Sequence, residues 1–316
     1  MLITYPDRRY GIFLCFKPHL FKTLIEIKPL QNLKATVTVP GSKSYTNRAL
    51  LIAGLTDGEC RLEKPLVSDD TKYMIQALKA FGVPVREEEG AFIVSGKGGK
   101  LCAPDNDIFI GNAGTAMRFL TTFSTLAPGK VRLDGDERMH ERPLADLLDC
   151  LTQMGIHAVS VNDNGCPPID IKGGEVPGGD VQLAGDKSSQ YLTSILLSAP
   201  YFKNDTCVQI QGDLTSKSYA DITLDIMKTF GVHVENESYQ HFKVITGDHY
   251  KAQTYQVESD WSSASYFLAA AAVTGGEVTL NGINPQSVQG DMQFTSALEK
   301  MGCHVLKKAN SLHIKG

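Results

Sequence analysis

A pattern of apolar and polar residues recurs four times along the chain. Each copy has apolar residues three and four positions apart, then a glycine, then a short apolar run. This spacing predicts an amphipathic helix, and a glycine directly after it is typical of a helix end. The glycines are Gly82, Gly155, Gly231 and Gly302, which lie 73, 76 and 71 residues apart. Such regular spacing predicts a duplicated structural unit.

A second recurring feature comes about 40 residues before each of these glycines. There a short apolar run leads into a small polar turn, which predicts a strand followed by the start of another helix. The four turns occupy residues 40–44, 111–115, 185–190 and 259–263. Each unit is therefore predicted to run strand, helix, strand, helix, strand. Units of this kind pack helices against sheets, so the expected fold class is α/β, built from α+β repeats.

Length and composition narrow the function classes. A chain of 316 residues favours two domains over one. The net charge of −4 argues against a nucleic-acid or anionic-membrane partner. Seven cysteines, with no C-x-x-C pair and no H-x-x-x-H pair, argue against a disulfide framework and a metal site. We therefore expect a cytoplasmic protein.

The N-terminal region has two interpretations. Arg8 and Arg9 precede the apolar run 12–16, as in a signal peptide, but Lys17 and Pro18 interrupt that run. The alternative, which we favour, is a loosely attached extension over residues 1–23. Elsewhere no apolar run approaches the roughly 18 residues that span a bilayer, so we expect no membrane partner.

Two of the polar turns carry more than helix capping requires. Lys43 and Arg48 lie in the first turns of one predicted helix, where two cations are unfavourable without an anion or a carboxylate nearby. The turn 111–115 has two glycines, which allow close backbone approach, and Arg118 follows one helical turn later. Arg142 lies in a charged segment that is either part of a site or a solvated loop. Taken alone, any one of these turns is most simply a capped helix start.

Taken together, the motifs resemble the 5-enolpyruvylshikimate-3-phosphate (EPSP) synthase family. The matching segments, in order, are residues 40–50, 111–118, 141–143, 188–190 and 212–219, and the resemblance covers about residues 24–316. Enzymes of this family transfer the enolpyruvyl group of phosphoenolpyruvate to the 5-hydroxyl of shikimate 3-phosphate and release phosphate. The resemblance implies a two-domain fold of six units, a monomer, and no metal or organic cofactor.

The resemblance also implies the site residues. The residues implied to bind shikimate 3-phosphate are Lys43, Ser44, Arg48, Ser188, Ser189, Gln190 and Ser216. Those implied to bind phosphoenolpyruvate are Lys43, Gly114, Arg142 and Gln190. Supporting residues are Asn112, Thr115, Arg118 and Tyr219.

Four of the six expected units are present. We expect a complete three-unit substrate-binding domain over residues 42–257 and a partial second domain from residues 24–41 and 258–316. The family's acid/base residues would lie after Gly316, so no catalytic residue is assigned and we expect weak or no activity from this chain alone. One alternative is a non-catalytic remnant that binds shikimate 3-phosphate. Another is a UDP-N-acetylglucosamine enolpyruvyl transferase, whose first motif usually lacks this arrangement of Lys43, Ser44 and Arg48.

Two positions depart from the family pattern. Phe119 follows Arg118 where the family usually has proline. A bulky ring without the proline restraint is expected to shift the turn at Gly114 and Thr115. We therefore predict weaker phosphoenolpyruvate binding and an altered response to glyphosate, which competes there; unchanged constants in a Phe119→Pro variant would contradict this. Ser218 also replaces a common proline.

Overall fold

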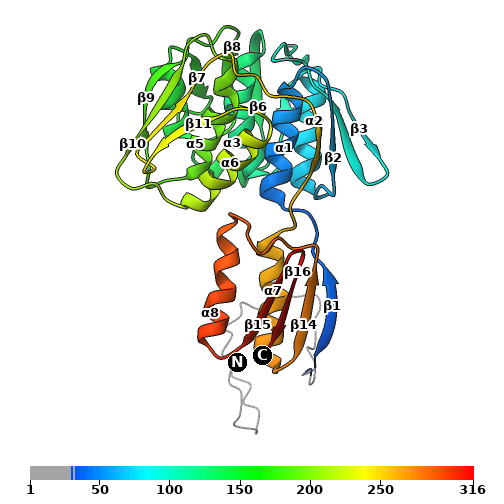
Figure 1. The fold of residues 1–316 in the computed structure, drawn as a ribbon. Helices are drawn as coiled ribbons and strands as arrows, with labels where there is room; N and C mark the ends of the chain where they lie inside the picture. Colours follow the sequence, from blue (N-terminus) through cyan, green and yellow to red (C-terminus); the bar gives the residue numbers. More distant parts are fainter. Residues whose placement is uncertain (1–29, 31–32) are drawn as a thin grey trace, which may run out of the picture.

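The computed structural model describes residue 30 and residues 33–316. The predicted extension over residues 1–23 lies outside the described residues. Two bodies are visible in Figure 1. The larger body has a core that extends in sequence from Tyr45 to Val257, and the smaller body has a separate core formed by Val39 and residues from Trp261 to Ile314.

Both bodies are built from the predicted unit, with one strand more than expected. In chain order, the first unit comprises β1 (Lys34–Thr38), α1 (Lys43–Leu55), β2 (Glu59–Glu63), α2 (Asp69–Ala80), β3 (Val85–Glu88) and β4 (Ala91–Ser95). The second comprises β5 (Ile108–Phe109), α3 (Gly114–Phe123), β6 (Gly129–Asp134), α4 (Ala145–Gln153), β7 (His157–Ser160) and β8 (Ile169–Gly173). The third comprises β9 (Gly179–Ala184), α5 (Ser189–Ser198), β10 (Thr206–Gln211), α6 (Lys217–Thr229), β11 (Val234–Glu237) and β12 (His241–Val244). The fourth comprises β13 (Thr254–Gln256), α7 (Trp261–Thr274), β14 (Glu277–Asn281), α8 (Phe294–Lys300), β15 (His304–Lys308) and β16 (Ser311–Lys315).

The extra strand completes a four-stranded mixed sheet in every unit. The four sheets have the orders β5-β6-β8-β7, β9-β10-β12-β11, β13-β2-β4-β3 and β1-β14-β16-β15. In each sheet the first two strands are parallel and the other pairs are antiparallel. The last strand of a unit thus inserts between the second and the third. The predicted unit of three strands and two helices was therefore incomplete, because it lacked this last strand.

The first and fourth units exchange their first strands. β1 pairs with β14 in the smaller body, while β13 pairs with β2 in the larger body. The chain therefore passes between the bodies twice, and the two passages lie together. Gly41 forms a β-bridge with Ser259, the Ser42 amide donates to the Glu258 carbonyl at 2.7 Å, and the Asp260 amide donates to the Pro40 carbonyl at 2.9 Å.

The four predicted helix ends are confirmed by one recurring hydrogen bond. The residue after each glycine donates its amide to a carbonyl five residues back: Val83 to Leu78, Ile156 to Leu151, Val232 to Met227 and Cys303 to Leu298, at 2.9–3.0 Å. Each glycine has a positive φ, from 77° to 104°. This is the Schellman arrangement, in which only glycine avoids a steric cost.

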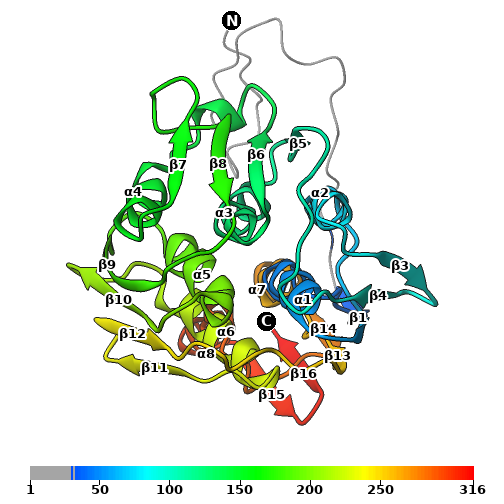
Figure 2. The same cartoon turned by 90° about the horizontal axis from the view of Figure 1, so that it is seen from above.

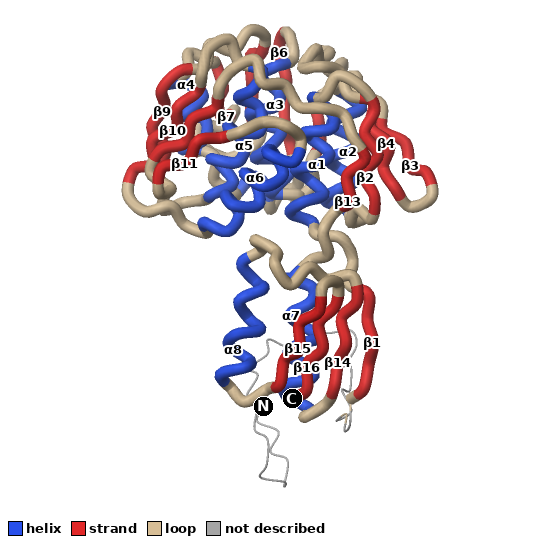
Figure 3. Tube along the Cα trace, viewed as in Figure 1, coloured by secondary structure: helices blue, strands red, loops and turns tan. Residues whose placement is uncertain are grey.

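The helices α1, α3 and α5 form the centre of the larger body, and the sheets lie around them (Figures 2 and 3). From their second turns onward these helices are almost entirely buried. Each packs against the other two. In the smaller body α7 and α8 pack against one sheet (Figure 3). Within the described residues, no helix is long and apolar enough to cross a membrane, and no group of three metal-ligating side chains gathers.

Candidate functional site

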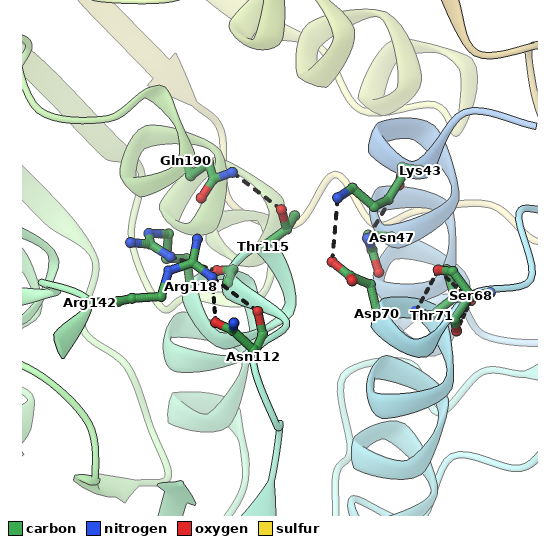
Figure 4. Close-up of polar contacts among 11 residues, drawn as sticks. Lys43, Asn47, Ser68, Asp70, Thr71, Asn112, Thr115, Arg118, Arg142 and Gln190 are labelled. Carbon is green, nitrogen blue, oxygen red and sulfur yellow. Dashed lines mark hydrogen bonds and ion pairs between the residues drawn. The ribbon is translucent and has the colours of Figure 1, made fainter. Parts of the chain in front are cut away.

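The first turns of α1, α3 and α5 present polar side chains toward one another. Figure 4 shows Lys43, Thr115 and Gln190, one from each helix start, facing a common space. The Gln190 amide Nε2 donates to Thr115 Oγ1 at 3.2 Å. A helix start has free amide groups and the positive end of the helix dipole, so three starts that meet form a region that favours anions.

Lys43 has a carboxylate partner that the sequence did not reveal. Its Nζ lies 3.6 Å from Asp70 Oδ1, and its side chain is 49% exposed (Figure 4). Asp70 lies in the first turn of α2. The N-cap of that helix is Ser68, whose hydroxyl accepts from the Thr71 amide. The need for a partner to Lys43 was foreseeable, but its identity depends on how α1 packs against α2.

Arg142 lies against the start of α3. Its Nη1 donates to the carbonyl and to the side-chain oxygen of Asn112, at 3.0 and 3.2 Å. A Cβ atom at Gly114 would come within 2.2 Å of the Arg142 guanidinium carbon. The absence of a side chain at Gly114 therefore lets this guanidinium sit on the helix start.

Arg118 is buried close to Arg142. Its side chain donates to the Gly114 carbonyl at 2.9 Å and to the Pro143 carbonyl at 3.3 Å, and it lies over the Tyr191 ring. Burial lowers the pKa of Arg118, and the neighbouring Arg142 charge lowers it further. Among the described residues, neither arginine has a carboxylate within 4.0 Å. Two guanidinium groups without an acid favour the binding of an anion beside them.

Arg48, which the family resemblance implies to bind shikimate 3-phosphate, is buried among neutral groups. It is 1% exposed, and its nitrogens donate to the hydroxyls of Thr193 and Thr223 and to the carbonyls of Ser44 and Tyr219. Burial lowers its pKa to about 10. These four hydrogen bonds leave one of the five guanidinium N–H donors, on Nη1, without a partner among the described residues.

The third unit contributes two helix starts, those of α5 and α6. Ser188 is the N-cap of α5 and accepts from the Gln190 amide at 3.2 Å, while Ser189 is 3% exposed. Ser216 precedes α6 in a left-handed conformation, with φ 54° and ψ 49°. Such a backbone is uncommon outside glycine and is often found at functional positions.

A pocket of about 140 Å³ lies between the two bodies, next to these helix starts. The larger body lines it with Ser44 and Tyr219, among others, and the smaller body with Asp260, Ser262 and Asp291. The Ser262 hydroxyl bonds to the Asp291 carboxylate. The sequence analysis did not assign Asp260 or Asp291 to the site. Asp260 was detectable only as a helix-start residue, and it does cap α7 through the Ser263 amide.

The predicted residues thus fall into three groups. Lys43, Asn112, Thr115, Arg142 and Gln190 surround the space in Figure 4, with Gly114 against Arg142 and Ser188 at the helix start that carries Gln190. Ser44 and Tyr219 line the pocket between the bodies, with Ser216 at the nearby helix start. Arg48, Arg118 and Ser189 are buried behind these surfaces.

Comparisons with known proteins agree with this architecture. The EPSP synthase (3-phosphoshikimate 1-carboxyvinyltransferase) family matches residues 27–316. The chain is 46% identical over 285 residues to a 3-phosphoshikimate 1-carboxyvinyltransferase of Sulfurovum sp. (strain NBC37-1), covering 89% of this chain and 67% of the relative. It is 45% identical to that of Escherichia coli (strain SMS-3-5 / SECEC), with coverage of 89% and 66%.

A solved structure shares the fold. EPSP synthase from Acinetobacter baumannii superposes with a TM-score of 0.78 at 27% identity, covering 91% of this chain and 66% of that one. The chain spans about two thirds of the length of the relatives that it matches. The repeated units, the fold and the sequence identity agree, and the chain belongs to the EPSP synthase (3-phosphoshikimate 1-carboxyvinyltransferase) family.

Proposed function

We propose that this chain binds shikimate 3-phosphate and phosphoenolpyruvate and serves the transfer of the enolpyruvyl group to the 5-hydroxyl of shikimate 3-phosphate. The observation that carries the proposal is a pair of neighbouring arginines that lack an acidic partner. Arg118 and Arg142 have no carboxylate partner among the described residues, and they lie beside the helix starts that also present Lys43. Both substrates are polyanions, and holding two of them together requires this kind of field.

Each substrate is assigned to its own part of the site. We assign the phosphate and carboxylate of phosphoenolpyruvate to Arg142, the Gly114 turn, Gln190 and Lys43. We assign shikimate 3-phosphate to Lys43, Ser44, Arg48, Ser188, Ser189, Gln190 and Ser216. Asn112, Thr115, Arg118 and Tyr219 support the site. The contacts of Arg142 with Asn112 and of Gln190 with Thr115 support a common site for these residues.

The reaction needs proton transfer as well as binding. The 5-hydroxyl must lose a proton and the methylene carbon of phosphoenolpyruvate must gain one, so a positioned donor and acceptor are required. We assign no catalytic residue. Since the relatives are longer than the matched region, we expect residues 1–316 alone to bind substrate with little or no turnover.

We also propose domain boundaries. The substrate-binding domain would comprise residues 42–257, and the second domain residues 24–41 and 258–316. The extent of the two cores supports this division. A fragment of residues 42–257 that retains binding of shikimate 3-phosphate would test it.

Calorimetry tests the proposed function directly. Titration with shikimate 3-phosphate alone should release or absorb heat and reach saturation. Phosphoenolpyruvate should bind more tightly when shikimate 3-phosphate is present. UDP-N-acetylglucosamine should not compete; if it binds in place of shikimate 3-phosphate, the chain is the alternative transferase. Binding of shikimate 3-phosphate without any effect of phosphoenolpyruvate would favour a remnant that only binds.

Location and assembly complete the proposal. We infer a cytoplasmic monomer, which the cysteine pattern and the family resemblance support. Analytical ultracentrifugation tests the second part, because a monomer should sediment near 34.4 kDa at all concentrations.

A further inference from the structure

We propose that Phe119 is a positioning residue that supports the Arg48 guanidinium with the face of its ring, in the place where a carboxylate counter-ion would otherwise be needed. The charge of Arg48 then stays available to an anionic substrate. This last step rests on the proposed function, whereas the contact itself does not.

The geometry brings together two buried side chains from different helices. The Arg48 guanidinium carbon lies 5.1 Å from the centroid of the Phe119 ring. Phe119 on α3 is fully buried and Arg48 on α1 is 1% exposed. A cation within about 6 Å of a ring centroid is attracted by the negative face of the ring, more strongly when both groups are desolvated.

Every other partner of Arg48 is neutral. Its hydrogen bonds go to the hydroxyls of Thr193 and Thr223 and to the carbonyls of Ser44 and Tyr219. Within the described part of the chain, no carboxylate oxygen lies within 4.0 Å of its nitrogens. A buried charge without a counter-ion is costly, so the environment must stabilise it in another way.

An aromatic ring stabilises the buried Arg48 guanidinium without cancelling its charge. A carboxylate beside Arg48 would make a neutral pair and would repel a substrate anion, whereas an aromatic ring has no net charge. The same arrangement occurs a second time, since the Arg118 guanidinium lies 5.8 Å from the centroid of the Tyr191 ring, again without a carboxylate among the described residues. Both buried arginines of the site are therefore backed by aromatic side chains.

The contact also links α1 and α3, which both contribute residues to the proposed site. Arg48 is bonded to the first turn of α1 through Ser44, and Phe119 belongs to the helix that begins at Gly114. The Phe119 ring therefore connects Arg48, and through it the first turn of α1, to α3.

Fluorinated phenylalanines at position 119 test the proposal, because they weaken the negative ring face stepwise with little change in shape. The matched control is Phe123 on the same helix, which is equally buried but packs edge-on against the Phe81 ring, 5.3 Å between centroids. In the full chain, the dissociation constant for shikimate 3-phosphate should rise stepwise with fluorination at 119, reaching about three- to thirtyfold. The same series at 123 should leave it within about twofold.

Urea unfolding separates this proposal from the proposed function. The midpoint should fall with fluorination at 119, and this fall should vanish in an Arg48→Met background. If the parent chain does not bind shikimate 3-phosphate but this coupling is present, the proposed function fails and the Phe119 contact stands. Equal effects at 119 and 123 on the affinity for shikimate 3-phosphate, or a fall in the urea midpoint at 119 that persists without Arg48, would overturn the role of Phe119.

Discussion

At the scale of single residues, the site depends on how closely Arg142 approaches the start of α3. Gly114 has no side chain, and the guanidinium occupies the place where a Cβ would be. The sequence indicated close backbone approach at this turn but not what would approach. The backbone of Gly114 does not require glycine, since its φ is not positive. Proximity to Arg142 is therefore the reason for glycine at this position.

The first prediction follows from this approach. In Gly114→Ala the guanidinium must move away from Asn112, so affinity for phosphoenolpyruvate should fall at least tenfold, a loss of about 1.4 kcal/mol or more. The free energy of unfolding should change by less than about 1 kcal/mol, because alanine suits a helix. Calorimetry and urea unfolding measure the two quantities. Unchanged phosphoenolpyruvate affinity would show that Arg142 is not positioned by this turn.

The second prediction concerns Lys43. Lys43→Met should weaken shikimate 3-phosphate binding by at least tenfold, because a cation at the meeting point of the helix starts is lost. Stability should change by less than about 1 kcal/mol, since partly exposed ion pairs contribute little. Lys72→Met is the matched control, because Lys72 pairs with Asp69 at 3.2 Å in the first turn of α2. A similar loss of affinity in both variants would mean that only the general charge matters.

At the scale of elements, helix ends were the most predictable feature because their signals are local. A run of apolar residues with helical spacing and a following glycine fixes a hydrogen bond between residues only five apart. The burial of Arg48 and the pairing of Lys43 with Asp70 were not predictable in this way. Both depend on the packing of α1 against other helices, which no local pattern encodes.

The third prediction compares two of these helix ends. At Gly155, with φ 77°, a Cβ would meet no atom within 4 Å, whereas at Gly82, with φ 80°, it would lie 2.8 Å from Cys102 Sγ. Gly155→Ala should therefore cost only the backbone strain, about 1–2 kcal/mol. Gly82→Ala should cost more, because Cys102 must also move. Urea unfolding measures both; equal losses would mean that the space around Gly82 adapts freely.

The strand exchange is the element-level feature that the repeat pattern did not predict. The repeats place β1 before α1 and β13 before α7, which suggests that each stays with its own unit. In the structure each pairs with the other unit's second strand. The grouping of residues 24–41 with 258–316 came only from the family resemblance. The repeat pattern also left out the fourth strand of each sheet, because its position between two others is set by pairing rather than by sequence spacing.

At the scale of the whole molecule, the two cores are unequal. The larger joins three units around α1, α3 and α5, while the smaller rests on one sheet and two helices. In the smaller body α7 leaves Tyr266 and Val273 78% and 83% exposed. Units of this kind gain stability by burying their faces against neighbours. The smaller core should therefore be the weaker one.

The fourth prediction uses the chain's single tryptophan. Trp261 is fully buried in the smaller core, where its indole Nε1 donates to the Asn284 carbonyl at 3.0 Å. In a urea titration, tryptophan fluorescence should change at a lower concentration than far-UV circular dichroism, which reports mainly the larger body. Shikimate 3-phosphate should move the second transition more than the first. Coincident transitions by both probes would show that the two cores unfold together.

The exchanged strands also limit the order in which the sheets can be completed during translation. The parallel neighbour of β2 is β13, which is synthesised after all three units of the larger body, and β1 must wait for β14. Until then the nascent chain carries two strands with open edges, which are prone to pair with other chains. Covering these edges during translation therefore guards the nascent chain against such pairing.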